Sequence, residues 1–330
     1  MTFKSRERKS MEGDKPKSRS EARLDSTSSR VLGILLPAVY VAILLVFCFI
    51  YKVWPTPELV AVCFLIYAAY NKWTRRFVRD WIPLILIFLS YEAMDTVVGH
   101  ISTSNMQQPI NAIARAELQL FGSLPTLVLQ QSFRSPLLDF LSAFFYSLHF
   151  IAPVVFAFLL WKYSPKNYQG FLIAFAIGTY TALITFLLYP VAPPWYAFNT
   201  LYNLKYPISS PQVVRVLLQM DKQDFGSPFY KTIFDYVESN PFAAFPSLHA
   251  MYPWIISLYT LKIKKTRGLP ILLFPAAVWF GAVYLGEHYV IDIMGGAVYG
   301  TCAFFLTERL IPIVRTRWHT YRTAQKSTEQ

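Results

Sequence analysis

Two of the five histidines in this chain of 330 residues stand in patterns that suit catalysis. His288 is followed four residues later by Asp292, and in a helix this spacing places the imidazole and the carboxylate on one face, one turn apart. His249 ends a Pro-Ser-Leu-His pattern, in which proline and serine are typical of the first positions of a helix. Free backbone N–H groups at such a helix start bind anions, so Ser247 and Leu248 are candidate substrate-binding residues.

These groups suit phosphoryl transfer. A carboxylate that holds one imidazole nitrogen leaves the other as a basic lone pair, which can attack phosphorus, while a second imidazole protonates the leaving alkoxide. The two histidines must then face each other across the phosphate. We therefore expect His249 and His288 to lie at the same outer depth of a membrane, at the mouths of two helices.

The composition is that of a membrane protein. Hydrophobic residues make up 54% of the chain and charged residues 15%, against about 25% charged in an average soluble domain. A mean hydropathy of +0.35 excludes disordered, collagen-like and solvated coiled-coil chains, which need polar or strictly periodic sequences. The three cysteines lack metal-ligand spacing and no acidic cluster predicts Mg²⁺, so we expect no metal and no other cofactor.

Eight apolar runs are candidate membrane spans. A bilayer core about 30 Å thick needs about 20 apolar residues in a helix. Runs of that order cover residues 31–51, 57–71, 81–99, 137–161, 169–190, 246–262, 270–286 and 288–311. The sequence therefore predicts an all-α polytopic membrane bundle of about eight transmembrane helices.

Positive charge predicts the orientation. With an inside N-terminus, the inner segments hold 24 of the 31 Lys and Arg residues and the outer segments 7, as the positive-inside rule expects of an even number of spans. Both termini are thus predicted to be cytoplasmic, and topology accounts for the basic charge without nucleic-acid binding. The predicted division is a disordered basic tail over 1–30, a transmembrane catalytic domain over 31–311 and a C-terminal tail over 312–330.

Two long segments are predicted on the outer side. Residues 101–136 contain apolar residues at helical spacing over 111–122, which predicts a helix lying in the interface. Residues 191–245 open with a stiff Pro-Pro-Trp-Tyr turn that suits the headgroup layer, and they include a predicted helix over 213–220. Tyr196 in that turn is a candidate substrate contact, although an interface anchor is the favoured interpretation.

Other polar residues near the spans allow two interpretations each. His149 lies inside the fourth span, where a histidine bonded to a neighbouring helix and one that contacts substrate are equally good interpretations. Glu92 and Asp95 either pair with Arg115 or face a headgroup cavity, and pairing is favoured. Glu287 either tunes the neighbouring histidine or caps the helix.

The histidine motifs resemble those of the type 2 phosphatidic acid phosphatase superfamily, whose members share Pro-Ser-Gly-His and a later motif ending in His-x3-Asp. The departures are specific. Leu248 stands in place of the Gly, Gly281 and Ala282 replace the usual Ser-Arg, and Tyr189-Pro190 stands where a Lys and an Arg-Pro pair are expected.

These departures resemble one branch, the inositol phosphorylceramide synthase-like group, with Phe-Pro-Ser-Leu-His, Ala-Pro-Pro-Trp-Tyr and Glu-His-Tyr-x2-Asp close to its pattern. The resemblance covers roughly residues 110–300 and implies a six-helix lipid-phosphatase-like core. It implies that His288 is the nucleophile, Asp292 its orienter, and His249 the acid and later the base. It also implies a membrane phospholipid donor, with phosphoinositol as headgroup, and a lipid-alcohol acceptor such as ceramide. The site would face the extracytoplasmic or lumenal side of a cell membrane or endomembrane.

The absence of the Lys and Arg residues that are usual in the superfamily motifs indicates the charge of the substrate. A phosphate monoester is a dianion that needs guanidinium or ammonium partners, whereas a phosphodiester carries one charge and needs fewer cations. The substituted positions therefore favour a phosphodiester lipid. Cations of the outer segment could replace the missing ones, namely Lys205, Arg215, Lys222 or Lys231.

Two alternatives remain. A lipid phosphate or pyrophosphate phosphatase of the same superfamily would use water in place of the lipid acceptor. A transporter or channel would line a path with Glu92, Asp95 and His149. It would show an inverted repeat, which the sequence lacks, and would leave the helix-mouth histidines unexplained. The sequence carries no signal for an oligomeric state.

Overall fold

The computed structural model describes residues 57–100, 107–197, 213–217 and 242–328. Within these ranges the regular structure is helical, apart from an isolated bridge between Val191 and Ala243. The predicted all-α class is confirmed. The predicted span over 31–51 and the tail over 1–30 lie outside the described residues.

The helices follow the predicted spans closely. They are α2 (Pro57–Tyr70), α3 (Thr74–His100), α6 (Pro136–Tyr163), α7 (Pro165–Leu188), α12 (Leu248–Lys264), α13 (Leu273–Tyr284) and α14 (Val290–Thr328). A 3₁₀ helix, η3 (Lys265–Leu272), joins α12 to α13.

Four described segments are long and apolar enough to cross a membrane: Pro136–Tyr163, Pro165–Leu188, Leu248–Tyr284 and Val290–Leu310. The chain is thus an integral membrane protein. The third segment holds α12, η3 and α13, where the sequence predicts two spans. Helix α14 continues past residue 311, the predicted end of the membrane domain, although its apolar part ends at Leu310. The number of eight spans stays a prediction.

Proline marks the starts of two central helices. Helix α6 begins at Pro136, after Ser135, whose side chain accepts a hydrogen bond from Leu138 N at 3.3 Å. Helix α7 begins at Pro165, one residue after the C-cap of α6. Proline fits the first turn because the N–H that it lacks has no helical partner there. The short connection makes α6 and α7 packed neighbours.

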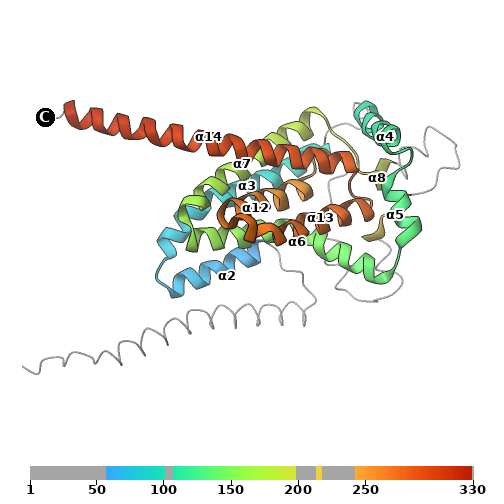
Figure 1. The fold of residues 1–330 in the computed structure, drawn as a ribbon, viewed down its shortest axis with the longest axis horizontal. Coiled ribbons are helices and arrows are strands. Elements are labelled where there is room, and N and C mark those ends of the chain that lie inside the picture. The colour runs from blue at the N-terminus through green and yellow to red at the C-terminus, as the bar shows by residue number, and fades with distance from the viewer. Residues whose placement is uncertain (1–56, 101–106, 198–212, 218–241, 329–330) are drawn as a thin grey trace, which may run out of the picture. The chain divides into compact units, whose positions relative to one another are not determined.

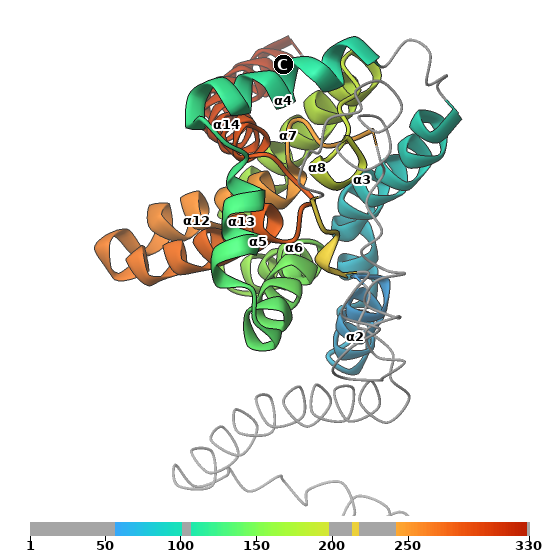
Figure 2. The same ribbon diagram turned by 90° about the vertical axis from the view of Figure 1, so that its right-hand side faces the viewer.

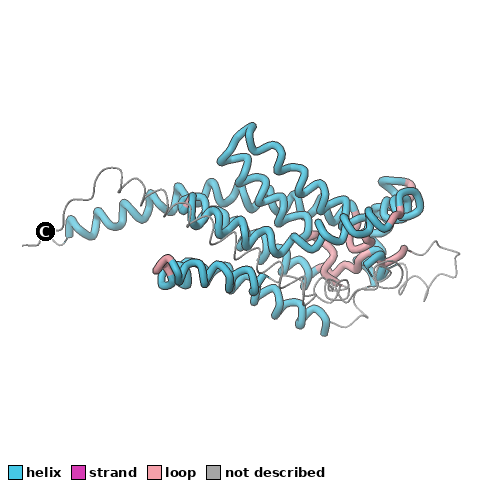
Figure 3. The backbone as a smooth tube through the Cα atoms, turned by 90° about the horizontal axis from the view of Figure 1, so that it is seen from below, coloured by secondary structure: helices cyan, strands magenta, loops and turns pink. Residues whose placement is uncertain are grey.

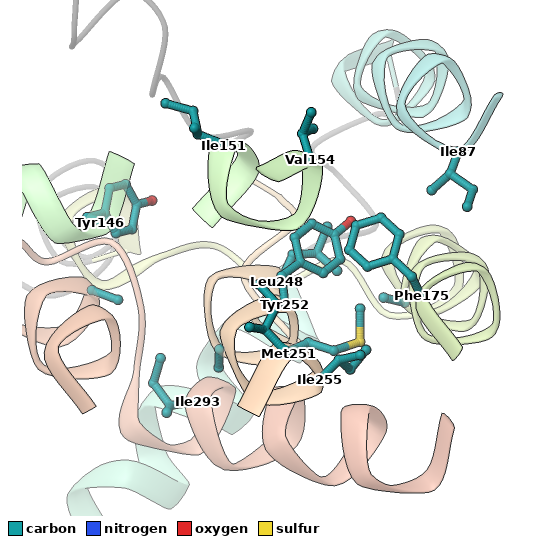
Figure 4. Packing of buried hydrophobic residues seen from close by; sticks show 14 of the residues in the cluster. Ile87, Tyr146, Ile151, Val154, Phe175, Leu248, Met251, Tyr252, Ile255 and Ile293 are labelled. Atoms are coloured by element: carbon teal, nitrogen blue, oxygen red, sulfur yellow. The ribbon is translucent and has the colours of Figure 1, made fainter. Parts of the chain in front are cut away.

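Helix α12 lies among the other long helices (Figures 1 and 2) and packs against α6, α7, α13 and α14. Figure 4 shows Met251, Tyr252 and Ile255 of α12 in the apolar cluster, with Phe175 of α7 and Val154 of α6 nearby. This packing fixes the first turn of α12 relative to the helices around it.

Loops gather at one end of the bundle, where α4 (Gln107–Phe121), α5 (Pro125–Phe133) and the short α8 (Pro194–Tyr196) lie (Figures 1 and 3). Helix α4 confirms the helix predicted over 111–122, while its place in the membrane interface stays a prediction. Of the helix predicted over 213–220, residues 216–217 are helical and 218–220 lie outside the described residues.

Backbone hydrogen bonds tie the loop before α12 to the segment that follows α7. Val191 N donates to Phe242 O at 3.1 Å, and Ala244 N donates to Val191 O at 3.0 Å. The loop that leads into the Pro-Ser-Leu-His motif therefore has a fixed main-chain path.

Candidate active site

His249 lies in the first turn of α12. Ser247 is the N-cap, because its side chain accepts a hydrogen bond from Ala250 N at 3.2 Å. The helix therefore begins at Leu248, two residues later than the sequence predicts, and Pro246 precedes the cap rather than opening the helix.

His288 lies in the turn between α13 and α14, just before the helix on which its spacing predicts it. The turn is tight, since Glu287 N and His288 N both donate to Ala282 O at 3.1 Å. Gly286 adopts a φ of +85° here, which glycine tolerates because it has no Cβ. The turn places His288 against the loop that precedes α12.

Asp292 and the carbonyl of Ala244 hold the Nδ1 side of the His288 ring. Asp292 Oδ2 accepts a hydrogen bond from Tyr289 N at 2.8 Å and lies 3.5 Å from His288 Nδ1, so the two side chains approach each other as their spacing predicts. Ala244 O lies 3.1 Å from the same nitrogen. A carbonyl oxygen only accepts, so Nδ1 carries a proton and Nε2 keeps its lone pair.

The rings of His249 and His288 meet directly although they are 39 residues apart, with 3.0 Å between His249 Nδ1 and His288 Nε2. Because His288 Nε2 accepts, His249 Nδ1 donates. His249 Nε2 is buried and has no hydrogen-bond partner among the described residues. The main chain supports the approach, since Ser247 N donates to Asp292 O at 3.1 Å.

Two residues of α6 contact the His249 ring. The Tyr146 ring stacks on it at 3.9 Å with 8° between the planes, and the His149 ring lies 3.5 Å away between centroids. His149 Nδ1 donates to Tyr146 O at 2.9 Å, which fixes the His149 ring against its own helix. These contacts hold the His249 ring in place from a neighbouring helix.

A small cavity adjoins the histidines. The side chains with polar atoms that line it in the described part of the chain are Tyr91, His149, His249, Glu287 and His288, and Leu248 is among the apolar residues. The volume is about 20 Å³, which is enough for one water molecule. The cavity must therefore widen to admit a phospholipid headgroup.

Arg215 and Glu287 form a buried ion pair beside this cavity. Arg215 Nε lies 2.8 Å from Glu287 Oε1, and the side chains are 5% and 0% exposed. Trp195 Nε1 donates to Glu287 Oε2 at 3.1 Å, and the Arg215 guanidinium lies 4.0 Å over the Trp195 ring. The charge of Arg215 is thus balanced by Glu287. The other three cations considered above, Lys205, Lys222 and Lys231, lie outside the described residues.

A family model for the PAP2 superfamily matches residues 111–306, a range that includes both histidines and Asp292. The chain belongs to the PAP2 superfamily. The resemblance seen in the motifs is therefore confirmed.

Curated relatives indicate which branch of the PAP2 superfamily this chain resembles. A phosphoinositol dihydroceramide synthase of Bacteroides thetaiotaomicron is 33% identical over 162 residues, which cover 48% of this chain and 52% of the relative. The inositol phosphorylceramide synthase catalytic subunit of Saccharomyces cerevisiae is 29% identical over 234 residues, 66% of this chain and 55% of the relative. Undecaprenyl-diphosphatase BcrC of Bacillus subtilis is 30% identical over 73 residues, 22% of this chain and 38% of the relative. The chain spans about half the length of the curated synthases that it matches. No solved structure matches it.

Six of the seven site residues predicted from the sequence lie together in this PAP2 chain: His149, Ser247, Leu248, His249, His288 and Asp292. Tyr196 is absent from the described lining of the cavity, and its ring lies 5.4 Å from Trp195 and 5.7 Å from Phe242. The side chains of Glu92 and Asp95 lie outside the described part of the structure.

Sequence reasoning missed Tyr146 and Glu117. Tyr146 precedes His149 by three residues, so the shared helix face was a usable signal. Glu117 follows the buried Ile113 by four residues, which places an acidic side chain on the apolar face of α4. A carboxylate on that face indicates a specific buried partner.

The described part of this PAP2 chain holds no group of three or more His, Cys, Asp or Glu side chains that could bind a metal ion. That the reaction needs no metal or other cofactor stays a prediction.

Proposed function

We propose that this chain is a membrane phosphotransferase. It moves a phosphoinositol headgroup from a glycerophospholipid to the hydroxyl of ceramide or dihydroceramide through a phosphohistidine. The observation that carries the proposal is the 3.0 Å contact between His249 Nδ1 and His288 Nε2, with Asp292 at the other nitrogen of His288. This arrangement supports an acid and a nucleophile acting on one phosphate.

In the first half-reaction, the lone pair of His288 Nε2 attacks phosphorus, and the bond from phosphorus to the diacylglycerol oxygen breaks. His249 enters this step as the imidazolium, with a proton on each ring nitrogen, and its Nδ1 proton goes to that oxygen. Diacylglycerol leaves as a neutral alcohol, and His249 remains as a neutral imidazole that keeps its Nε2 proton. The phosphate takes the place of the direct hydrogen bond between the two rings. The modified His288 keeps its Nδ1 proton and is cationic, and Asp292 and Ala244 O stabilise it.

In the second half-reaction, His249 Nδ1 is unprotonated and accepts the proton of the sphingoid hydroxyl. The hydroxyl oxygen attacks phosphorus, and the bond from phosphorus to His288 Nε2 breaks with its electrons returning to the nitrogen. The two histidines regain their starting protonation states. One pair of side chains thus serves both donor cleavage and acceptor attack.

The names of the relatives and the charge of the site support a phosphodiester donor. The relatives are named for phosphoinositol, dihydroceramide and phosphorylceramide. The ion pair between Arg215 and Glu287 offers little net positive charge to a dianionic monoester. A singly charged phosphodiester fits better, so phosphatidate is expected to be a poor donor.

We propose further that the site faces the extracytoplasmic or lumenal side and that both termini are cytoplasmic. Helix α12 supports this orientation, since His249 lies in its first turn and Lys262 and Lys264 lie in its last. Basic residues favour the cytoplasmic end of a span, so His249 would lie at the opposite end.

The test uses purified protein in mixed micelles with headgroup-labelled phosphatidylinositol, with and without dihydroceramide. We expect a labelled sphingolipid that forms only with acceptor present, and we expect none from His288→Ala. Cys302→Ala, at an exposed site on α14, is the matched control and should keep the wild-type rate. Substantial turnover by His288→Ala would contradict the role of His288 as nucleophile.

The match to undecaprenyl-diphosphatase BcrC supports a second candidate, a hydrolase in which water resolves the same intermediate. The same assay separates the two functions. Release of water-soluble phosphoinositol without acceptor, at a rate that dihydroceramide does not reduce, would favour hydrolysis.

A further inference from the structure

Glu117 of α4 reaches the start of the helix that carries Asp292. Its side chain is fully buried, and the two carboxylate oxygens accept hydrogen bonds from Val290 N at 3.1 Å and Ile291 N at 3.2 Å. The first N–H groups of an α-helix have no hydrogen-bond acceptor within the helix. In α14, Glu117 provides an acceptor oxygen for each of the first two N–H groups. Asp292 Oδ2 accepts from the N–H just before them, that of Tyr289, at 2.8 Å.

We infer that Glu117 is a positioning residue of the active site, whose carboxylate holds the first turn of α14 so that Asp292 meets His288. The inference rests on the proposed function, because it assigns Glu117 a part in the same reaction. Glu117 does not touch the reacting histidines in the described structure. It acts through the main chain of Val290 and Ile291, which directly precedes Asp292.

The geometry makes the site sensitive to this contact. Asp292 Oδ2 lies 3.5 Å from His288 Nδ1, and the main-chain carbonyl of Asp292 accepts a hydrogen bond from Ser247 N at 3.1 Å. If the first turn of α14 shifts, both distances change together. The capping bonds of Glu117 therefore support the orientation of the His288 ring and the contact between the starts of α12 and α14.

The charge state of Glu117 determines whether it can accept both hydrogen bonds from the start of α14. Burial raises the pKa of Glu117 to about 7, and the two N–H bonds partly oppose this rise. Asp292 is the charged group that faces it from α14, the helix packed against α4, and its like charge raises the pKa further. The carboxylate can accept from both N–H groups, whereas the protonated acid turns one oxygen into a donor that faces a donor. The cap therefore forms as the pH rises through about 7 and is lost as the pH falls below it.

Glu117→Gln tests the inference because the amide keeps the shape of the carboxylate but has one acceptor oxygen. We expect kcat to fall about tenfold or more, since small displacements of catalytic groups strongly reduce rates, while KM for phosphatidylinositol changes little. Wild-type activity should rise with pH through about 7, and this acid limb should be absent in Glu117→Gln. Gln119→Ala, at an exposed position of the same helix, is the matched control and should keep the wild-type rate and pH profile.

Hydrogen exchange gives a readout that does not depend on activity. The amides of Val290 and Ile291 should exchange about tenfold faster in Glu117→Gln than in Gln119→Ala, because their acceptor is weakened. If Glu117→Gln does not fold, Glu117→Asp takes its place. The shorter carboxylate should lower kcat, retain the acid limb and speed exchange at the same two amides.

The outcomes separate this inference from the proposed function. An inactive His288→Ala together with wild-type kcat, pH profile and exchange in Glu117→Gln overturns the role of Glu117 alone. An active His288→Ala overturns the proposed mechanism, and with it the catalytic role of Glu117. Unchanged exchange at Val290 and Ile291 overturns the cap itself, whatever the activity.

Discussion

Gly296 of α14 lies against the first turn of α12, where even one added carbon would collide with the main chain. A Cβ at Gly296 would lie 2.2 Å from Ser247 O and 2.9 Å from Ala250 Cβ. Real Cβ contacts essentially never fall below 3.0 Å, so in Gly296→Ala the distance to Ser247 O must grow from 2.2 to at least 3.0 Å, by about 0.8 Å. The obstacle is backbone, so the starts of the two helices must move apart.

The expected effect on rate follows from this displacement. His249 lies two residues after Ser247, and its ring is 3.0 Å from His288, so the shift changes the distance on which the proposed mechanism depends. A misplacement of about 1 Å can cost about 10²-fold in rate, and overpacking costs about 1–3 kcal/mol of stability. We therefore expect Gly296→Ala to lower kcat for phosphoinositol transfer about 100-fold while remaining folded. Initial rates in mixed micelles and thermal unfolding of the same sample measure the two effects.

Gly300→Ala is the matched control. It lies one turn further along α14, and its new Cβ would meet side-chain atoms of Ile255, Met251 and Trp254, each at 3.3 Å. Side chains can give by a few tenths of an ångström without moving the helix starts, so we expect a rate close to wild type. Wild-type kcat in Gly296→Ala, or an equal loss in both variants, would refute the argument that the spacing of the helix starts sets the rate.

Two further predictions concern charged side chains. Asp292→Asn should lower kcat by about 10⁴-fold with the fold intact, because the amide no longer fixes the imidazole tautomer and orientation; a rate within tenfold of wild type would contradict this role. Arg215→Met should leave the Glu287 carboxylate buried without its ion-pair partner and destabilise the protein by about 3–5 kcal/mol. Adding Glu287→Gln should restore most of the melting temperature. An unchanged melting temperature in Arg215→Met alone would show that the ion pair does not hold the turn before His288.

Hydropathy could predict the membrane helices because bilayer thickness fixes the length of an apolar run. The runs over 137–161 and 169–190 correspond to α6 and α7 with shifts of a few residues at the ends. Helix starts depend on single hydrogen bonds, which hydropathy does not register. Helix α12 begins at Leu248 and not at the predicted residue 246, because the Ser247 side chain caps the helix.

Local spacing also indicated that His288 and Asp292 approach each other, but it could not identify partners from distant segments. Glu117 bonds Val290, which lies 173 residues further along the chain. Gln130 of α5 bonds both main-chain groups of Val214, 84 residues away, and holds the segment that carries Arg215. The sequence near Glu117 indicates that it has a buried partner, but the sequence near neither residue identifies that partner, because these contacts arise from the packing of whole helices.

The loop over residues 242–247 shows why the site depends on the main chain. Ala244 N donates to Val191 O in the segment that follows α7, and Ala244 O accepts from His288 Nδ1. Ser247 N bonds Asp292 O, and the Ser247 side chain caps the helix that carries His249. All three proposed catalytic groups are thus tied to one short segment, mostly through backbone atoms that every residue type possesses. Substitutions that displace this backbone, such as Gly296→Ala, should therefore impair turnover even though they remove no functional group.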